Sequence, residues 1–455
     1  MTRTVLGLAG LAAILAVGGT GPAYGQDPTT SPAATPTPAA SRGPLAAADS
    51  PALTIAEVYR VARARSPRLR AAGALADATA TREASAGLPP DPVFQVGIMN
   101  FSLPDFDTDM PNSMAPAVQA MQMLPWFGKL GLSERIAEQS TAIARADAEE
   151  TWWEVRSRAA MAFYTIYESD RQLEVMRETL QLLRNFERVA KAMYGAGEGR
   201  QVDVLRAAVE VARMDADIER MEAMRTSAVA RLNGVLDRPS GTPVDALVFC
   251  ALPMDLPEAD TLRAWAEASR PMLEGARTGV ERARARSDLA RKEIWPDPVI
   301  GFQYGQRASD VGTRRMGSAM IGFSIPLFAK SRQLRRRDEA AVMEAMARAD
   351  LADMRAHVDA RIGELLAELD RTRTLVELYR REVLPQARAN VESSFSSYRV
   401  GAVDFMTLVD AQMTVNRYDQ ELYALLAEYG RSVAELEMTI GRELPPSTHV
   451  LAEAR

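Results

Sequence analysis

The sequence has very few of the residues that build disulfide bonds and metal centres. Cys250 is the only cysteine among 455 residues, so the chain cannot form an internal disulfide bond. The two histidines, His357 and His449, lie far apart, and no group of histidine, cysteine and acidic residues has the spacing of metal ligands. We therefore expect no metal site and no cofactor, and we expect Cys250 to be inert.

The sequence also lacks a strong charge and the known catalytic motifs. Its formal net charge is only −6, and no basic stripe with interleaved aromatic residues is present, which argues against nucleic-acid binding. A nucleophile elbow, a phosphate-binding loop and a metal triad are all missing from the sequence. These absences predict that the protein is not an enzyme.

A long hydrophobic run occurs only at the N-terminus. Arg3, the apolar segment Val5–Val17 and the small residues Ala23-Tyr24-Gly25 are typical of a secretory signal peptide over residues 1–25. A membrane anchor is the alternative, but the apolar run is short and rich in glycine. We therefore expect the chain to be exported across the inner membrane.

The segment that follows the predicted signal peptide cannot build a core. Residues 26–52 consist largely of proline, alanine, threonine and serine, which predicts an extended leader. Residue Gln26 stands where a lipid-modified cysteine would stand, so no acylation is expected there.

The remaining chain consists of two similar halves. Segments of the first half recur in the second at an offset of 201 to 206 residues, which predicts that both halves share one fold. The clearest matches are Pro90-Asp91-Pro92-Val93 with Pro296-Asp297-Pro298-Val299, Leu124-Pro125-Trp126-Phe127 with Ile325-Pro326-Leu327-Phe328, and Tyr194-Gly195-Ala196-Gly197 with Tyr398-Arg399-Val400-Gly401. Each half is expected to contain one helix, two strands, a long helix, a glycine-containing turn and a returning helix.

Apolar residues with a period near 3.5 predict a long helical hairpin in each half, over 129–236 and 330–442. Charged residues fill the positions between the apolar stripes, so these helices face water and do not span a membrane. At about 1.5 Å per residue such a helix reaches roughly 100 Å, with a break or kink expected at Pro385.

Two short segments of alternating residues precede each helical hairpin. Strands are predicted at about 91–103 and 116–127, and at about 297–307 and 315–328. The alternation fits either a half-buried soluble hairpin or a membrane barrel. The strand length, the polar hairpin loops, and Trp126 and Trp295 at strand ends, where a membrane belt of aromatic residues would lie, favour the barrel.

Four strands cannot close a barrel, and lipid does not tolerate open strand edges. If these strands are in the membrane, several copies of the chain must share one barrel. The duplication then predicts an oligomer whose barrel continues into a tube of helices.

The sequence from Leu53 to Pro445 resembles the outer-membrane efflux proteins, the TolC family. The resemblance is carried by the duplicated Pro-Asp-Pro-Val motif, by residues 124–130 and most specifically by residues 398–412. It implies a mostly α-helical homotrimer in which a 12-stranded outer-membrane β-barrel, four strands from each of three chains, continues into a periplasmic α-helical tunnel. It also implies the exit duct of a tripartite efflux system in a Gram-negative bacterium, surrounded by outer-membrane lipid. The partners would be a periplasmic adaptor (membrane fusion protein) and an inner-membrane pump of the resistance-nodulation-division type.

The resemblance also implies a gate at the periplasmic mouth, built from acidic, basic and tyrosine side chains near the glycine turns. An arginine that the family carries after the second turn is replaced here by Val403, so either Asp404 and Arg206 substitute for it or the gate is held by other contacts. The alternative is that the acidic residues are helix-start acids favoured by the helix dipole. The residues matched to gate positions are Asp203, Tyr398 and Asp410. With the two substitutes, the predicted gate comprises Asp203, Arg206, Tyr398, Asp404 and Asp410.

The tips of the two helical hairpins are the expected contacts of the adaptor. They comprise Gly197 and Glu198 in the first half and Val400 and Gly401 in the second. Glycine allows the chain to reverse and another helix to approach closely, although a plain turn glycine is the alternative.

The 22 methionines raise the question of copper transport, because thioethers are ligands for Cu(I). Most, such as Met176 and Met214, occupy helix stripe positions and are read as core packing. Four others, Met110, Met114, Met121 and Met123, cluster around one loop and strand. Because residues 124–129 resemble metal-efflux members of the family, metal ions are slightly favoured over drugs as the cargo.

These predictions divide the chain into consecutive parts. They are a signal peptide (1–25), a leader (26–52), a first efflux repeat (53–243), a linker (244–257), a second efflux repeat (258–445) and a C-terminal tail (446–455). The alternative function is a periplasmic coiled-coil adaptor or scaffold without a barrel, which would carry one helical hairpin rather than two.

Overall fold

The computed structural model describes residues 53–99, 114–245, 247–309, 312–325, 327–445, 447 and 449–451. Residues Ser50–Arg455 belong to one compact unit. The predicted signal peptide (1–25) and leader (26–52) lie outside the described residues, as do Met110 and most of the predicted tail.

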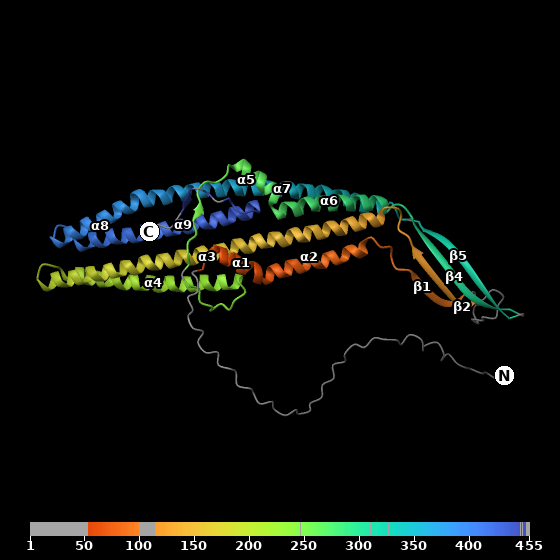
Figure 1. The fold of residues 1–455 in the computed structure, drawn as a ribbon, viewed down its shortest axis with the longest axis horizontal. Coiled ribbons are helices and arrows are strands. Elements are labelled where there is room, and N and C mark those ends of the chain that lie inside the picture. The colour runs from red at the N-terminus through yellow and green to blue at the C-terminus, as the bar shows by residue number, and fades with distance from the viewer. Residues whose placement is uncertain are drawn as a thin grey trace, which may run out of the picture. The chain divides into compact units, whose positions relative to one another are not determined.

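The first half contains two short helices and one long helical hairpin. Its helices are α1 (Ile55–Arg65), α2 (Pro67–Ala86), α3 (Lys129–Gly195) and α4 (Gln201–Val235). Helix α3 runs unbroken for 67 residues, roughly 100 Å, and packs against α2 and α4. It also packs against helices of the second half, so it holds the two halves together (Figure 1).

The second half repeats this plan with one interruption. Its helices are α5 (Ala259–Ser269), α6 (Pro271–Lys292), α7 (Gln333–Leu378), a π-helical turn (Tyr379–Val383), α8 (Leu384–Arg399) and α9 (Phe405–Ile440). Pro385 lies in the first turn of α8, where its missing N–H costs least, and the π-turn directly precedes that helix. None of the described helices is both long and apolar enough to cross a membrane.

Each half has two short helices before its strands, so the expectation of one helix there is wrong. Pro67 and Pro271 each begin a new helix directly after the preceding one ends. A proline cannot continue a helix, but it fits the first helical position. The Ser66 hydroxyl also accepts a hydrogen bond from the N–H of Leu69 and so caps α2.

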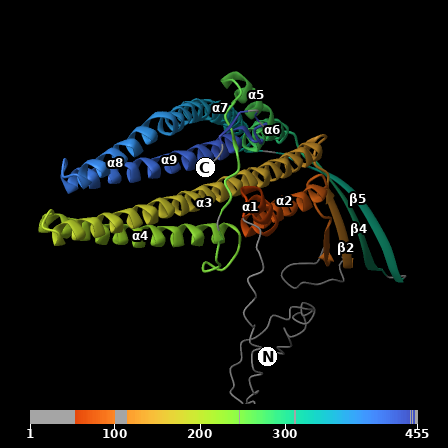
Figure 2. The same ribbon diagram turned by 60° about the vertical axis from the view of Figure 1, so that its left-hand side comes forward.

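The strands form an antiparallel sheet in the order β1-β2-β4-β5. These strands are β1 (Val93–Met99), β2 (Met114–Met123), β4 (Asp297–Ser309) and β5 (Gly312–Ser324), and a separate small pair joins β3 (Leu252–Pro253) to β6 (Val450–Leu451). The contact of β2 with β4 joins the two halves, while β1 and β5 form the edges of the sheet. Figure 2 shows the sheet at the opposite end of the long helices from the hairpin tips.

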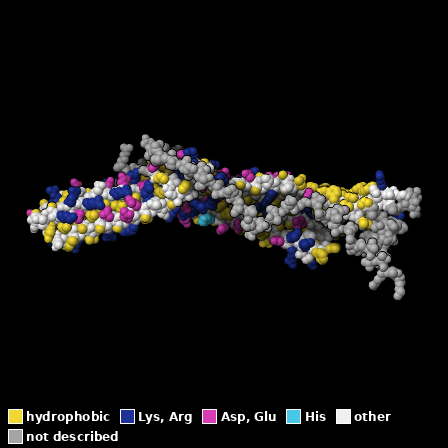
Figure 3. All heavy atoms as spheres, turned by 90° about the horizontal axis from the view of Figure 1, so that it is seen from below, with side chains coloured by type: hydrophobic (Ala, Val, Ile, Leu, Met, Phe, Trp, Pro, Cys, Tyr) yellow, Lys and Arg dark blue, Asp and Glu magenta, His cyan; other side chains and the backbone are white. Residues whose placement is uncertain are grey.

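The two faces of the sheet differ in polarity. On one face, large apolar side chains are uncovered, among them Val96 (76% exposed), Ile321 (73%) and Phe302 (58%). On the other face, strands β2 and β4 present small or polar residues such as Ala117 and Gln303, which are buried. Figure 3 shows hydrophobic side chains gathered over the strand end of the molecule, whereas charged side chains are scattered along the helices.

The main core lies where the helices of both halves cross. It holds aromatic side chains of α3 and α9, including Tyr164, Tyr167 and Tyr429, all almost completely buried. The Tyr429 hydroxyl donates a hydrogen bond of 2.6 Å to the carbonyl of Pro253 and so ties the β3 segment to the helices. A second apolar cluster lies nearer the hairpin tips and includes Phe186, Met214 and Phe405.

Candidate functional site

The two hairpin tips have the same backbone geometry. Gly197 and Gly401 adopt φ angles of 78° and 73°, in the left-handed region where a side chain is strained. The N–H of Gly197 donates to the carbonyl of Tyr194, and that of Gly401 donates to the carbonyl of Tyr398, both at 3.0 Å. Apart from the chain neighbours, none of the described residues has an atom within 4 Å of the place where a Cβ would stand on either glycine. The turns therefore require glycine for their backbone, and both glycines face open space.

Residues predicted to form the gate lie close together and come from both hairpins. Tyr398 is 4% exposed and packs edge-on against Phe405, with ring centroids 5.6 Å apart. Burial raises the pKa of the Tyr398 hydroxyl, and the nearby Asp203 carboxylate of the first half raises it further. A neutral phenol therefore lies beside an acidic residue from the other hairpin.

Asp404 occupies the cap position at the start of α9. Its Oδ1 accepts hydrogen bonds from the N–H of Thr407 at 3.0 Å and from the Thr407 hydroxyl at 2.8 Å. These bonds lower the pKa of the Asp404 carboxyl, and the positive charges of Arg206 and Arg200 lower it further. Asp404 thus caps the start of α9 and is also attracted by the arginines of the first hairpin.

Asp410 does not join this cluster. It lies further along α9, exposed, on a groove of about 680 Å³ that is also lined by charged residues of α4 and α9. Glu210, Arg213, Arg417 and Glu421 are among them. The structure therefore brings Asp203, Tyr398, Arg206 and Asp404 to the tips and places Asp410 on an adjoining charged groove.

Sequence reasoning missed Arg200, whose charge acts on Asp404. The signal was available in the repeat, because Arg200 stands 204 positions before Asp404. The two tips thus carry opposite charges at equivalent positions, an arrangement that favours contact between the halves.

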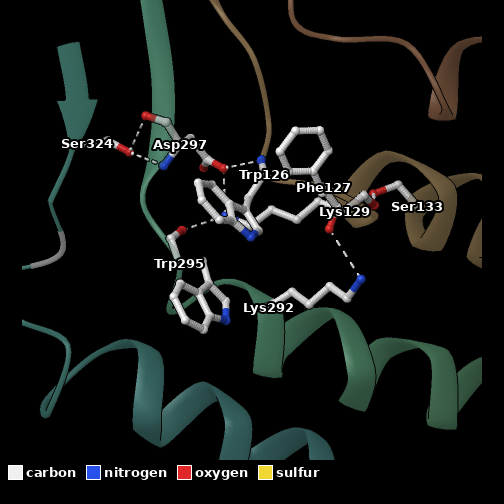
Figure 4. Close-up of polar contacts among 8 residues, drawn as sticks. All are labelled: Trp126, Phe127, Lys129, Ser133, Lys292, Trp295, Asp297 and Ser324. Atoms are coloured by element: carbon white, nitrogen blue, oxygen red, sulfur yellow. Dashed lines mark hydrogen bonds and ion pairs between the residues drawn. The ribbon is translucent and has the colours of Figure 1, made fainter.

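The junction of the sheet with the helices is the second place where the halves meet (Figure 4). Trp126 and Trp295 stack with ring centroids 5.8 Å apart and planes 9° from parallel. Asp297 Oδ1 accepts hydrogen bonds of 2.7 Å from both the N–H of Trp126 and Nζ of Lys129. The Lys129 ammonium also donates to the carbonyl of Trp295 at 3.0 Å.

Lys129 and Asp297 were not selected from the sequence. Lys129 is buried at the start of α3, where the helix dipole disfavours a positive charge, and its partner comes from the other half. Asp297 belongs to a motif that the repeat marks, and Lys129 belongs to the segment 124–130 that carries the family resemblance, but their pairing requires knowledge of which strands are neighbours. The membrane-belt role of Trp126 and Trp295 remains a prediction.

Within the described part of the chain, no group of three or more histidine, cysteine or acidic residues could hold a metal ion. Met176 and Met214 are buried in the helical core, as their stripe positions predicted. Met121 and Met123 lie on the face of the sheet that carries Gln119 and Gln303.

The comparisons with known proteins agree with this arrangement. The family model described as "Outer membrane efflux protein" matches residues 58–237 and 262–442, one segment in each half. The chain belongs to the outer membrane efflux protein family. A comparison with curated protein sequences gave no significant match.

Solved structures share the fold at low sequence identity. The outer membrane protein VceC of Vibrio cholerae is 14% identical, with a TM-score of 0.73 over 86% of this chain and 96% of that chain. The MtrE outer membrane channel of Neisseria gonorrhoeae is 16% identical, with a TM-score of 0.68 over 87% and 90%. CusC, whose structures concern transmembrane channel formation, is 15% identical, with a TM-score of 0.73 over 85% and 92%.

Membership of this family settles the class of function. The protein is an outer-membrane exit duct for efflux, with a helical periplasmic part, and it is not an enzyme. The alternative of an adaptor with one helical hairpin is wrong. The structure contains two helical hairpins, and each lies within one of the two segments that the efflux family model matches.

Proposed function

We propose that three copies of this chain form one closed 12-stranded barrel and one helical tunnel in the outer membrane of a Gram-negative bacterium. Support comes from the four-stranded sheet. Among the described residues, its edge strands β1 and β5 have no second strand beside them and its apolar face is uncovered. Such a sheet is unsuited to lipid until its edges are joined to others. Three such sheets supply the twelve strands of a closed barrel.

The tunnel receives its substrates through the hairpin tips. Gly197, Glu198, Val400 and Gly401 contact a periplasmic adaptor, which links the duct to an inner-membrane pump of the resistance-nodulation-division type. This proposal is supported by the open space around both tip glycines. The neighbouring residues Asp203, Arg206, Tyr398 and Asp404 form the gate, with Asp410 on the groove beside it.

Heavy-metal ions are the first class of cargo to test. The proposal is supported by thioether and amide side chains on one face of the sheet, among them Met121, Met123 and Gln303. This is the face opposite the large apolar side chains, so it lines the passage of a closed barrel. Thioethers are soft ligands that suit metal ions such as Cu(I).

Deletion of the chain tests the proposal as a whole. A deletion strain is expected to become sensitive to some members of a panel of metal salts, drugs and detergents, and the wild-type chain should restore resistance. The protein should sediment with the outer membrane and leave it as a trimer only in detergent. A purified protein that is monomeric and dissolves without detergent would contradict the proposal.

The adaptor contact needs a test that separates it from the demands of the turn. Valine at both Gly197 and Gly401 adds bulk and backbone strain, whereas asparagine adds bulk but tolerates the left-handed region. If the tips bind the adaptor closely, both double variants should form trimers and lose efflux. Wild-type resistance in the Gly197→Asn/Gly401→Asn variant would show that these glycines serve the turn alone.

A further inference from the structure

The two halves of the chain are equivalent strand by strand. In the first strand pair, Val93 lies opposite Met121 and Gln95 lies opposite Gln119. Adding the repeat offset, 206 residues for the first strand and 201 for the second, gives the equivalent pairs of the second half. These pairs are Val299 opposite Gly322 and Gly301 opposite Met320. Both of these pairs are present in the second half. The duplication therefore preserves the hydrogen-bond register of the sheet.

The same offsets give each edge strand a counterpart inside the sheet. Strand β5 corresponds to β2, and strand β1 corresponds to β4. In the chain, β2 and β4 pair with each other, with Ala120 opposite Phe302 and Gln122 opposite Ile300. The edges β5 and β1 lie too far apart in the strand order to pair within one sheet, since β2 and β4 separate them.

We propose that β5 of one copy pairs with β1 of the next copy in the register of the β2–β4 contact. Ile321 then lies opposite Val96 of the neighbouring copy, and Met320 lies opposite Gly97. The Phe323 ring lies opposite the Phe94 ring. This inference rests on the proposed trimer and specifies the interface that closes its barrel.

The junction below the sheet supports the same partner. The counterparts of Lys129 and Asp297 are Lys330 and Asp91, which are both exposed. Neither has an ion-pair partner among the residues described. A neighbouring copy placed in the inherited register brings the Lys330 ammonium to the Asp91 carboxylate, and this reproduces the ion pair that joins the halves.

Apolar residues at the junction are also uncovered where the repeat predicts a contact. Trp126 and Trp295 stack inside the chain, and their counterparts are Leu327 and Pro89. Leu327 is 84% exposed, and Leu88, next to Pro89, is also exposed. The neighbouring copy would cover these side chains as the tryptophans cover each other.

The interface continues along the helices. Val409 of α9 is 1% exposed because it packs in the cluster shared with α3, while its counterpart Leu205 of α4 is 58% exposed. Val209, the counterpart of the partly buried Met413, is likewise exposed. Within the chain, α9 packs against α3. The repeat therefore places α4 against the counterpart of α3 in a neighbouring copy, which is α7 with α8, and α4 has an apolar surface there.

Cysteine pairs test the register directly. In a Cys250→Ser background, Val96→Cys with Ile321→Cys and Gly97→Cys with Met320→Cys sample two neighbouring pairs, since pair types alternate along antiparallel strands. Val96→Cys with Phe323→Cys is the matched control, shifted by two residues. Opposite Cβ atoms lie at disulfide distance and diagonal ones do not, so at least one predicted pair should crosslink about tenfold more than the control in mild oxidant.

The outcomes separate this inference from the proposed function. Trimers in detergent that crosslink best through the shifted control would overturn the register and leave the trimeric duct standing. Absence of any trimer would overturn the proposed function, and the interface with it. Helix content by circular dichroism identifies variants that fail to fold, and a folded trimer without crosslinks at either predicted pair also refutes the register.

Charge exchange tests the ion pair between copies. Lys330→Asp or Asp91→Lys alone should lower the temperature at which the trimer dissociates, because each places like charges together. The double exchange should restore most of the loss. A double variant no more stable than the less stable single variant would refute the pair.

Discussion

Removal of the Arg156 side chain is expected to destabilise the helical core, because it leaves the Glu437 carboxylate buried without its counter-charge. The two side chains join α3 to α9, with Nη2 of Arg156 2.7 Å from Oε2 of Glu437. Each side chain is only 11% exposed. The N–H of Leu444 donates a further hydrogen bond to Glu437 at 3.0 Å, which would remain after the substitution.

The size of the loss follows from this burial. Breaking a buried ion pair by removing one partner costs about 3–5 kcal/mol of unfolding free energy. The exposed pair Arg184 and Asp215 provides a matched control, since Arg184→Met should cost less than about 1 kcal/mol. Arg156 also covers the Tyr59 ring at 4.3 Å, so Arg156→Met keeps an apolar stem over that ring.

The double variant Arg156→Met/Glu437→Leu isolates the electrostatic part of the loss. Replacing both members of a buried pair by apolar residues of similar volume is often close to neutral. We therefore expect the second substitution to recover most of the stability lost in Arg156→Met. Guanidinium unfolding of the detergent-solubilised protein, followed by helical circular dichroism, measures each variant.

The stability lost in Arg156→Met, called the deficit below, should also depend on pH. Burial raises the pKa of the Glu437 carboxyl, while Arg156 and the Leu444 N–H lower it, so loss of Arg156 removes a lowering influence. An acid whose pKa is raised by folding favours the folded state at low pH, and that contribution is lost as the pH rises through the folded pKa. The deficit of Arg156→Met should therefore be larger at about pH 8 than at about pH 5. A deficit no larger than that of Arg184→Met, or one independent of pH, would refute this reasoning.

Three further predictions concern the tips and the junction. Tyr398→Ala should lower the free energy of unfolding by about 3–5 kcal/mol and raise the resting conductance in planar bilayers. Tyr398→Phe should keep the stability and the conductance near wild type because the buried ring remains. Equal conductance in the two variants would count against a gate role for the ring. Asp404→Ala should speed amide hydrogen exchange at the start of α9. Because the pKa of Asp404 is lowered, this difference from wild type should disappear as the pH falls through that pKa. A difference that persists in acid would exclude capping by the carboxylate. Lys129→Met should lower the temperature at which helix content is lost, because it leaves Asp297 without its counter-charge between the two halves of the chain. Lys129→Met/Asp297→Asn should recover part of that loss; no recovery would mean that the lysine acts through packing.

Most of what could be predicted about the fold came from the spacing of apolar residues along the sequence. The 3.5-residue stripes predicted the helical hairpins, and the two-residue alternation predicted strands with one apolar face, which Phe302 and Gln303 illustrate. The second short helix of each half was missed because Pro67 and Pro271 begin helices rather than ending the helical region. Local patterns describe single elements well, but a proline has two opposite meanings that depend on its place in the helix.

Contacts between the halves could not be predicted in the same way. The Lys129–Asp297 pair spans 168 residues, and it depends on β2 lying beside β4, which no local pattern specifies. The resemblance matched Asp203, Tyr398 and Asp410 to gate positions, with Arg206 and Asp404 as substitutes. The structure places Asp410 further along α9, on the neighbouring groove, and the gate remains a prediction.

The duplication gives the proposed trimer two kinds of interface, or seam, one between the halves of a chain and one between copies, and the two differ in strength. The seam between the halves holds a lysine–aspartate pair whose lysine is buried and a tryptophan stack, in addition to the strand contact. The proposed seam between copies repeats the strand contact and the ion pair, but replaces the stacked tryptophans by Leu327 and Pro89. Stacked aromatic rings bury more surface and add a specific attraction, so the seam within the chain is the stronger one. Heating in detergent should therefore separate the trimer into chains whose halves are still joined, and helix content should persist beyond trimer dissociation.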